Sequence, residues 1–143
     1  MNTVRVMLPV RANRQDNRFF NPHSTIRNRM SAITTHVLDI TSGCPARGLS
    51  VTLEQQTPAA IWQVIGKGVT DDDGRLRDLL TPGTSLMVGN YRLTFDTETY
   101  FAQQRIEGFY PQVVVAFTVR DAGFHYHVPP LLSPFGYTTY RGS

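Results

Sequence analysis

From residue 32 onward the chain is divided into short runs rich in β-branched and aromatic residues, separated by turn-forming glycine, proline or aspartate. Runs of this length and spacing are typical of an all-β sandwich. The sequence therefore predicts an all-β fold of seven or eight strands. The expected strands lie at residues 32–40, 49–55, 61–70, 91–96, 109–119, 124–132 and 137–140.

One segment, at residues 97–105, has helical rather than strand periodicity. Tyr100, Phe101 and Gln104 are spaced so that they share one face of a helix. The hydroxyl of Thr97 is suited to accept a backbone N–H at the helix start. We therefore expect one short helix with Thr97 as its cap.

The length of 143 residues suits one domain preceded by an extension. The first 29 residues have weak periodicity and are rich in asparagine and arginine. We expect residues 1–30 to be a disordered or targeting extension and residues 31–143 to form the domain. We assign no role to His23, which lies in this extension.

Charge and cysteine content limit the partners and the compartment. The net charge is +3, but the first 29 residues hold six arginines and one acidic residue, so the domain has no basic stripe and we expect no nucleic-acid partner. No apolar run approaches the roughly 20 residues that cross a bilayer, so we expect no membrane partner. Cys44 is the only cysteine, which excludes an internal disulfide and favours a reducing compartment. We expect a cytoplasmic location, with a peroxisomal one as the alternative.

Two histidines near the end of the chain alternate with apolar residues. Successive side chains point to opposite faces of a strand, so Phe124, Tyr126 and Val128 share one face and His125 and His127 share the other. We expect the apolar face to meet the core. Both histidines would then point away from it.

The first strand has a similar pattern, because His36 shares a face with Leu38 and Ile40. Aliphatic side chains beside a histidine, repeated on different strands, suit a sheet surface that another subunit covers. We therefore predict a site at a subunit interface. A histidine on a strand is also an ordinary surface or structural residue, so this pattern alone leaves that alternative open.

The last four residues, 140–143 (Tyr-Arg-Gly-Ser), are polar at a chain end, where fraying is the default, and we take them as a candidate site. The pair His125 and His127 could hold a metal ion. Two histidines leave a zinc site short of ligands, and Cys44 lies in a distant turn, so we expect no metal.

Several of these segments resemble 5-hydroxyisourate hydrolase, the transthyretin-related enzyme of urate breakdown. The resemblance covers residues 31–143, and its most specific element is the terminal Tyr-Arg-Gly-Ser, which the hormone carrier transthyretin lacks. The segments are 34–39 (Thr-Thr-His-Val-Leu-Asp), 73–75 (Asp-Gly-Arg), 109–111 (Phe-Tyr-Pro), 125–129 (His-Tyr-His-Val-Pro) and 137–143.

The resemblance implies a transthyretin-like sandwich of two four-stranded sheets with one short helix, assembled as a homotetramer with active sites between dimers. It implies hydrolysis of 5-hydroxyisourate to 2-oxo-4-hydroxy-4-carboxy-5-ureidoimidazoline, with no cofactor. One or both histidines would activate water while an arginine holds the substrate. The implied catalytic residues are His36, Arg75, His127 and Ser143, and the implied substrate-binding residues are His36, Arg75, Tyr140 and Arg141.

The chain departs from the family pattern at two places. Members commonly have Cys-Pro-Gly after the Gly-Arg, where this chain has Leu76, Arg77 and Asp78, and a leucine where it has Pro130. Because proline lacks a backbone N–H, we expect Pro130 to mark a sheet edge or a bulge. The alternative function is a transthyretin-like carrier of a small aromatic ligand, which the histidines and the tail argue against.

Overall fold

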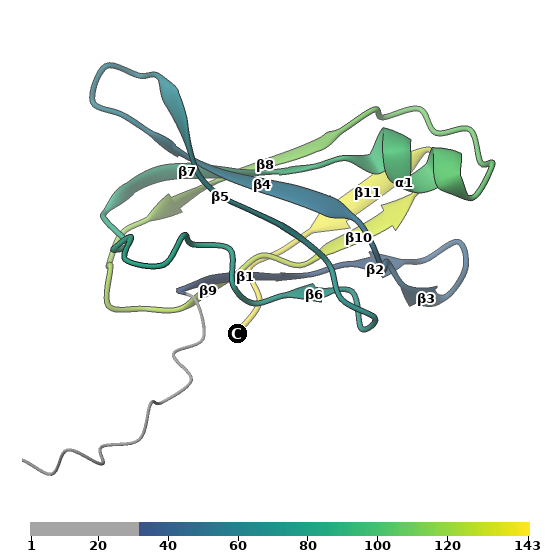
Figure 1. Cartoon of the computed structure of the whole chain (residues 1–143), viewed down its shortest axis with the longest axis horizontal. Helices are drawn as coiled ribbons and strands as arrows, with labels where there is room; N and C mark the ends of the chain where they lie inside the picture. Colours follow the sequence, from purple (N-terminus) through teal and green to yellow (C-terminus); the bar gives the residue numbers. More distant parts are fainter. Residues whose placement is uncertain (1–31) are drawn as a thin grey trace, which may run out of the picture.

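The computed structural model describes residues 32–143, so the predicted extension at residues 1–30 lies outside the described residues and stays a prediction. The described chain forms short strands and one helix (Figure 1). The elements are β1 (Ile33–His36), β2 (Leu38–Asp39), β3 (Cys44–Pro45), β4 (Ser50–Gln56), β5 (Trp62–Val69), β6 (Arg75–Leu76), β7 (Gly89–Phe95), α1 (Thr97–Gln103), β8 (Val113–Val119), β9 (Tyr126–His127), β10 (Pro130–Ser133) and β11 (Gly136–Thr139).

Two layers of strands face each other in Figure 1. One layer is a four-stranded antiparallel sheet in the order β5-β4-β7-β8. The other layer contains two hydrogen-bonded groups, β6-β1-β9 and β11-β10-β2-β3. The predicted all-β sandwich is therefore confirmed, with the second layer divided where its two long strands are interrupted.

The interruptions in the second layer have local causes. The predicted strand at residues 32–40 changes partners at Val37, whose N–H donates to the carbonyl of Gly74 and whose carbonyl accepts from Ala46. The predicted strand at 124–132 is divided at Pro129 and Pro130, which have no N–H to donate. The expectation of an edge or bulge at Pro130 is wrong, because Pro130 is the first residue of β10, which has partners on both sides.

The core lies between the layers and is built from alternate residues of each strand. The predicted placement of His36 and Leu38 on the outward face of the first strand is confirmed, since both are only half-buried while Thr35 and Val37 are buried. The buried side chains include Ile33, Val37, Leu49, Leu53, Leu79, Tyr91, Leu93, Phe95, Phe101, Val113, Tyr126, Val128 and Leu132.

Phe124 is the exception to the predicted core face. Tyr126 and Val128 are buried, but Phe124 is 61% exposed. The strand begins only at Tyr126, and the N–H of Phe124 donates to the carbonyl of Asp121 in the preceding turn. Strand alternation therefore does not extend back to Phe124.

The helix is present but begins with a different cap from the one expected. The side chain of Asp96 accepts the N–H of Thr99 at 3.1 Å, so Asp96 and not Thr97 is the N-cap. The hydroxyl of Thr97 instead donates to the carbonyl of Tyr110 at 2.6 Å. Tyr100 is buried, and its hydroxyl donates to the carboxylate of Asp39, which joins α1 to the β2 layer.

Several strand boundaries also differ from the prediction. The strand expected at 109–119 begins at Val113, because the proline at 111 interrupts it and Phe109 bonds to the carbonyl of Pro134 instead. The expected turn at Cys44 and Pro45 is the short strand β3, and β6 was not predicted. Within residues 32–143, the helix is too short to cross a membrane.

Candidate active site

Strand β1 lies at the centre of the candidate site, with β6 on one side and β9 on the other. The antiparallel pairing with β6 sets His36 directly opposite Arg75. The parallel pairing with β9 sets Thr34 directly opposite His127. Residues that face each other across a ladder have neighbouring side chains, so these registers bring together residues that are distant in sequence.

The acidic turn before β6 positions Arg75. The carboxylate of Asp71 accepts the N–H groups of Asp73 and Arg75, each at 2.9 Å, and the Arg75 hydrogen bond is the main reason that the pKa of Asp71 is lowered. Gly74 has a φ of 73°, in the left-handed region that favours glycine. A Cβ at Gly74 would lie 2.3 Å from the Val37 carbonyl oxygen, so the turn packs directly onto the strand layer.

The ring of His127 is held from two sides. Its Nδ1 lies 2.8 Å from the hydroxyl oxygen of Thr34, and a Cβ added to Gly142 would lie 2.5 Å from its Cδ2. Its Nε2 has no hydrogen-bond partner among residues 32–143. The nitrogen that remains available for chemistry is therefore Nε2.

The chain end is attached beside His127. The N–H of Gly142 donates to the carbonyl of His127 at 2.9 Å, which forms an isolated antiparallel bridge. The guanidinium of Arg141 lies 5.1 Å from the centroid of the Tyr126 ring, within the range of a cation–π contact. Figure 1 shows the terminus next to β1, β9 and β6. The tail is thus part of the site region.

A small pocket of about 120 Å³ joins the ends of these elements. Three of the four residues predicted to be catalytic line it: Arg75, His127 and Ser143. The other lining residues are Thr34, Thr35, Arg77 and His125. Within one chain the pocket therefore combines two guanidinium groups, two imidazole rings and the C-terminal residue.

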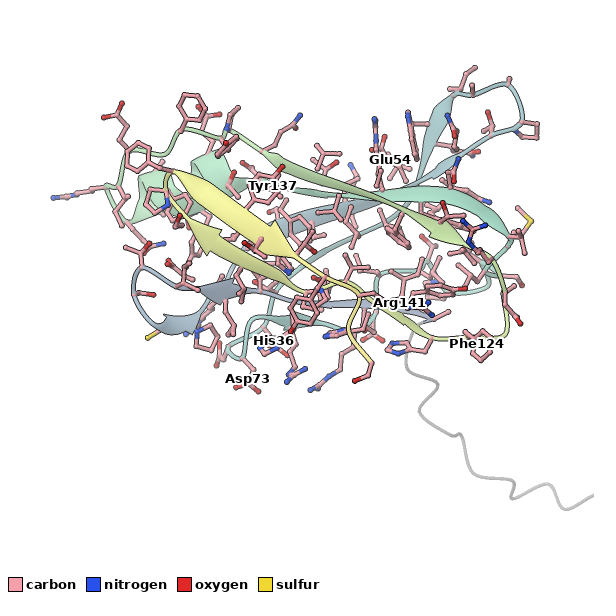
Figure 2. The ribbon with its side chains drawn as sticks, turned by 180° about the vertical axis from the view of Figure 1, so that it is seen from behind. His36, Glu54, Asp73, Phe124, Tyr137 and Arg141 are labelled. Carbon is pink, nitrogen blue, oxygen red and sulfur yellow. The ribbon has the colours of Figure 1, made fainter. Side chains whose placement is uncertain are left out.

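His36 lies next to this pocket but does not line it. Its Nε2 is 2.9 Å from the carbonyl oxygen of Asp73, and because a carbonyl only accepts, Nε2 must carry a proton. Figure 2 shows His36 and Asp73 close together on the side of the molecule opposite Glu54. This hydrogen bond leaves Nδ1 as the only nitrogen of a neutral His36 that could accept a proton.

The structure places the predicted substrate-binding residues Tyr140 and Arg141 in a second pocket. This pocket has a volume of about 230 Å³ and is bordered by β8, by β9 and by the end of β11. His127 lines both pockets, while Ser143 lines only the smaller one. Tyr140 and Arg141 therefore do not meet Arg75 in one cavity of a single chain.

The surroundings of His127 favour its neutral form. Burial lowers the pKa of the ring, and repulsion from Arg75 and from the cationic forms of His125 and His36 lowers it further. A neutral imidazole at pH 7 can accept a proton, which is the form that a general base needs.

Four lining residues were not predicted as site residues. Thr34 and Thr35 look like ordinary strand residues, and the sequence places His125 on the outward face beside His127 without assigning it a catalytic role. Arg77 lies two positions after Arg75, and Leu76 between them packs against the core, so alternation in an extended segment was the signal that could have identified it. No group of three or more histidine, cysteine or acidic side chains within residues 32–143 could hold a metal ion.

Known proteins are similar to this chain along most of its length. A family model described as the HIUase/Transthyretin family matches residues 33–142. The chain belongs to this family. It is 47% identical over 114 residues to the 5-hydroxyisourate hydrolase of Mus musculus, and the match covers 79% of this chain and 96% of the relative.

Solved structures of both branches of the family have the same fold. The 5-hydroxyisourate hydrolase of Klebsiella pneumoniae matches with a TM-score of 0.67 and 33% identity, over 78% of this chain and 98% of its own. Sea bream transthyretin in complex with thyroxine matches with a TM-score of 0.73 and 34% identity, over 78% and 94%. The transthyretin-like sandwich is therefore confirmed, and overall shape does not separate a hydrolase from a thyroxine-binding protein.

The electrostatic setting of His127 leads to a prediction for its titration. The ring should titrate below the ordinary pKa of 6.5, and Arg75→Gln should move the midpoint upward because it removes a nearby positive charge. NMR of the ring C–H signals over a pH series measures both. Arg105→Gln, which removes a charge beyond α1, is the control and should leave the midpoint unchanged. A midpoint of 6.5 or higher in the unaltered protein would contradict this view of the site.

Proposed function

We propose that the protein hydrolyses 5-hydroxyisourate to 2-oxo-4-hydroxy-4-carboxy-5-ureidoimidazoline in urate degradation. The observation that carries this proposal is the position of His127, which lines a pocket with Arg75 and Ser143 and whose Nε2 has no hydrogen-bond partner among residues 32–143. The 5-hydroxyisourate hydrolases of mouse and Salmonella dublin, 47% and 41% identical to this chain, support it. A cytoplasmic location, with a peroxisomal alternative, stays a prediction.

His127 is the better candidate for the general base. Water is a weak nucleophile at neutral pH, so its attack on the ring amide carbonyl requires a base. The proton moves from water to Nε2 of His127, a C–O bond forms, and the ring C–N bond breaks. The same Nε2 then returns the proton to the leaving nitrogen. His36 is less suited because its Nε2 already donates to Asp73.

The two arginines supply positive charge for the substrate and for the carboxylate that hydrolysis creates. A guanidinium offers paired N–H donors to a planar group with carbonyl oxygens, which a lysine cannot do. Arg75 is held by its turn and suits an oxyanion that develops during attack. Arg77, on the same face of the segment, adds a second positive group to the pocket.

We also propose a homotetramer with the sites at the dimer–dimer interface. The edge strands β8 and β11 lie side by side, since residues of both line one pocket, and each ends its sheet. Pairing both edges with a second copy would extend both layers. Leu38 and Leu131 are in register on the outer face near His36, and Ile40 is 58% exposed, which gives a second apolar surface.

The first prediction concerns turnover. The protein should accelerate the decay of 5-hydroxyisourate formed in place from urate and urate oxidase, and His127→Asn should lower kcat by about 10²- to 10⁴-fold because asparagine cannot take the proton. The ultraviolet absorbance of 5-hydroxyisourate follows the decay. Arg75→Gln should also be impaired, and Arg105→Gln should match the unaltered protein. Decay at the spontaneous rate would instead favour a ligand carrier.

The contact between the tail and His127 predicts a second effect. Gly142→Ala should lower kcat about tenfold or more, because the added Cβ forces the His127 ring or the tail to shift. The matched control is Gly136→Ala at the start of β11, where the added Cβ would have its nearest neighbour at 3.7 Å. Steady-state kinetics of the two variants test this. Equal activity of both would mean that the tail does not hold the ring.

The proposed assembly is tested by mass in solution. Analytical ultracentrifugation should give four times the chain mass of 16.1 kDa. Leu131→Glu, which places a charge on the outer face of β10, should give smaller species with reduced turnover. Val64→Glu on β5, where the valine is 47% exposed, is the control and should remain tetrameric. A monomer with full activity would contradict the proposal.

A further inference from the structure

The hydroxyl of Thr34 contacts both histidines of the β9 region. Its oxygen lies 2.8 Å from Nδ1 of His127 and 2.9 Å from Nε2 of His125. The residue is 3% exposed, and its side chain lies on the outer side of β1, because the neighbouring Ile33 and Thr35 are buried toward the core. The two rings are nearly parallel, with centroids 6.3 Å apart. The hydroxyl therefore bridges them.

One hydroxyl has one proton to donate, which limits how the bridge can form. If Thr34 donates to His125, it must accept from the N–H of His127 at Nδ1. If it donates to His127, it must accept from His125. A base at Nε2 of His127 needs that nitrogen unprotonated, so the neutral ring must carry its proton on Nδ1. The first arrangement is the one that makes His127 a base.

We propose that Thr34 is a positioning residue whose hydroxyl joins His127 to His125, so that the proton taken up by His127 is shared with the exposed His125 ring. This inference rests on the proposed hydrolase function and deepens it. His127 lines one pocket with Arg75 and Arg77, where a further positive charge is unfavourable. His125 borders the same pocket but is exposed, whereas His127 is half-buried, so water stabilises the charge better on His125.

The transfer is balanced at each atom. After Nε2 of His127 takes a proton from water, the ring is an imidazolium. Its Nδ1 proton passes to the oxygen of Thr34, while the hydroxyl proton of Thr34 passes to Nε2 of His125. His127 is then neutral with a proton on Nε2, and His125 is the imidazolium. The reverse movement restores the charge on His127 when its Nε2 gives the proton to the leaving nitrogen.

Kinetics of three variants test the proposal. Thr34→Val keeps the shape but removes the hydroxyl, and kcat should fall about 10- to 100-fold. Thr34→Ser keeps the hydroxyl and should stay within about threefold of the unaltered protein. His125→Gln can accept from Thr34 but cannot hold a proton, so kcat should fall while KM changes little. An equal loss of kcat in Thr34→Val and Thr34→Ser, or full activity of His125→Gln, would overturn the proposal.

A measurement independent of turnover keeps the proposal separate from the function. Nitrogen-15 NMR of the full chain at a pH above the imidazole titrations should show the proton of His127 on Nδ1, and Thr34→Ser should retain it there. A proton on Nε2 of His127 in the unaltered protein would overturn the proposal. This outcome does not depend on whether the variants of Thr34 and His125 fold. If the unaltered protein does not turn over 5-hydroxyisourate, the hydrolase function is refuted. The NMR measurement would still show whether Thr34 bridges the two histidines.

Discussion

The backbone hydrogen bonds that hold β1 between β6 and β9 are the constraint on which the site depends. His36 faces Arg75 across one ladder and Thr34 faces His127 across the other. A slip of one residue in either register would turn the paired side chains to the opposite face. The core residue Ile33 and the hydrogen bond from Thr35 to the carbonyl of Val128 oppose such a slip, because both come from the inner face of β1.

Two glycines allow the segments that flank these two ladders to pack closely against them. Gly74 allows the acidic turn to pack against the carbonyl of Val37, and this turn presents Arg75. Gly142 allows the tail to contact the ring of His127. The site is therefore formed by close backbone approaches at both ends of β1, and a side chain at either glycine would force these segments apart.

The fold of this chain is shared by a transthyretin in complex with thyroxine and by a 5-hydroxyisourate hydrolase. Similarity in overall shape is as high to the thyroxine complex as to a hydrolase, so the layers and their core carry no functional distinction. In this chain the candidate site residues lie outside the core, on short strands and at the chain end: His36, Arg75, His127 and Ser143. Substitutions at these positions therefore need not alter the packing between the two layers.

The sequence alone determined the features that depend on local geometry. The length and spacing of the β-rich runs predicted the all-β class, and side-chain alternation turned His36 and His127 away from the core. The sequence could not decide which residue is the N-cap of α1, because Asp96 and Thr97 are both suited to that position. In the structure the hydroxyl of Thr97 donates to the carbonyl of Tyr110, and Asp96 caps the helix. Only the tertiary structure decided that Thr34 meets two histidines more than 90 residues away, that Arg77 lines their pocket, and that Tyr140 and Arg141 border another. Alternation is fixed within a strand, whereas these contacts depend on the register between distant strands, which the whole fold sets through its backbone hydrogen bonds.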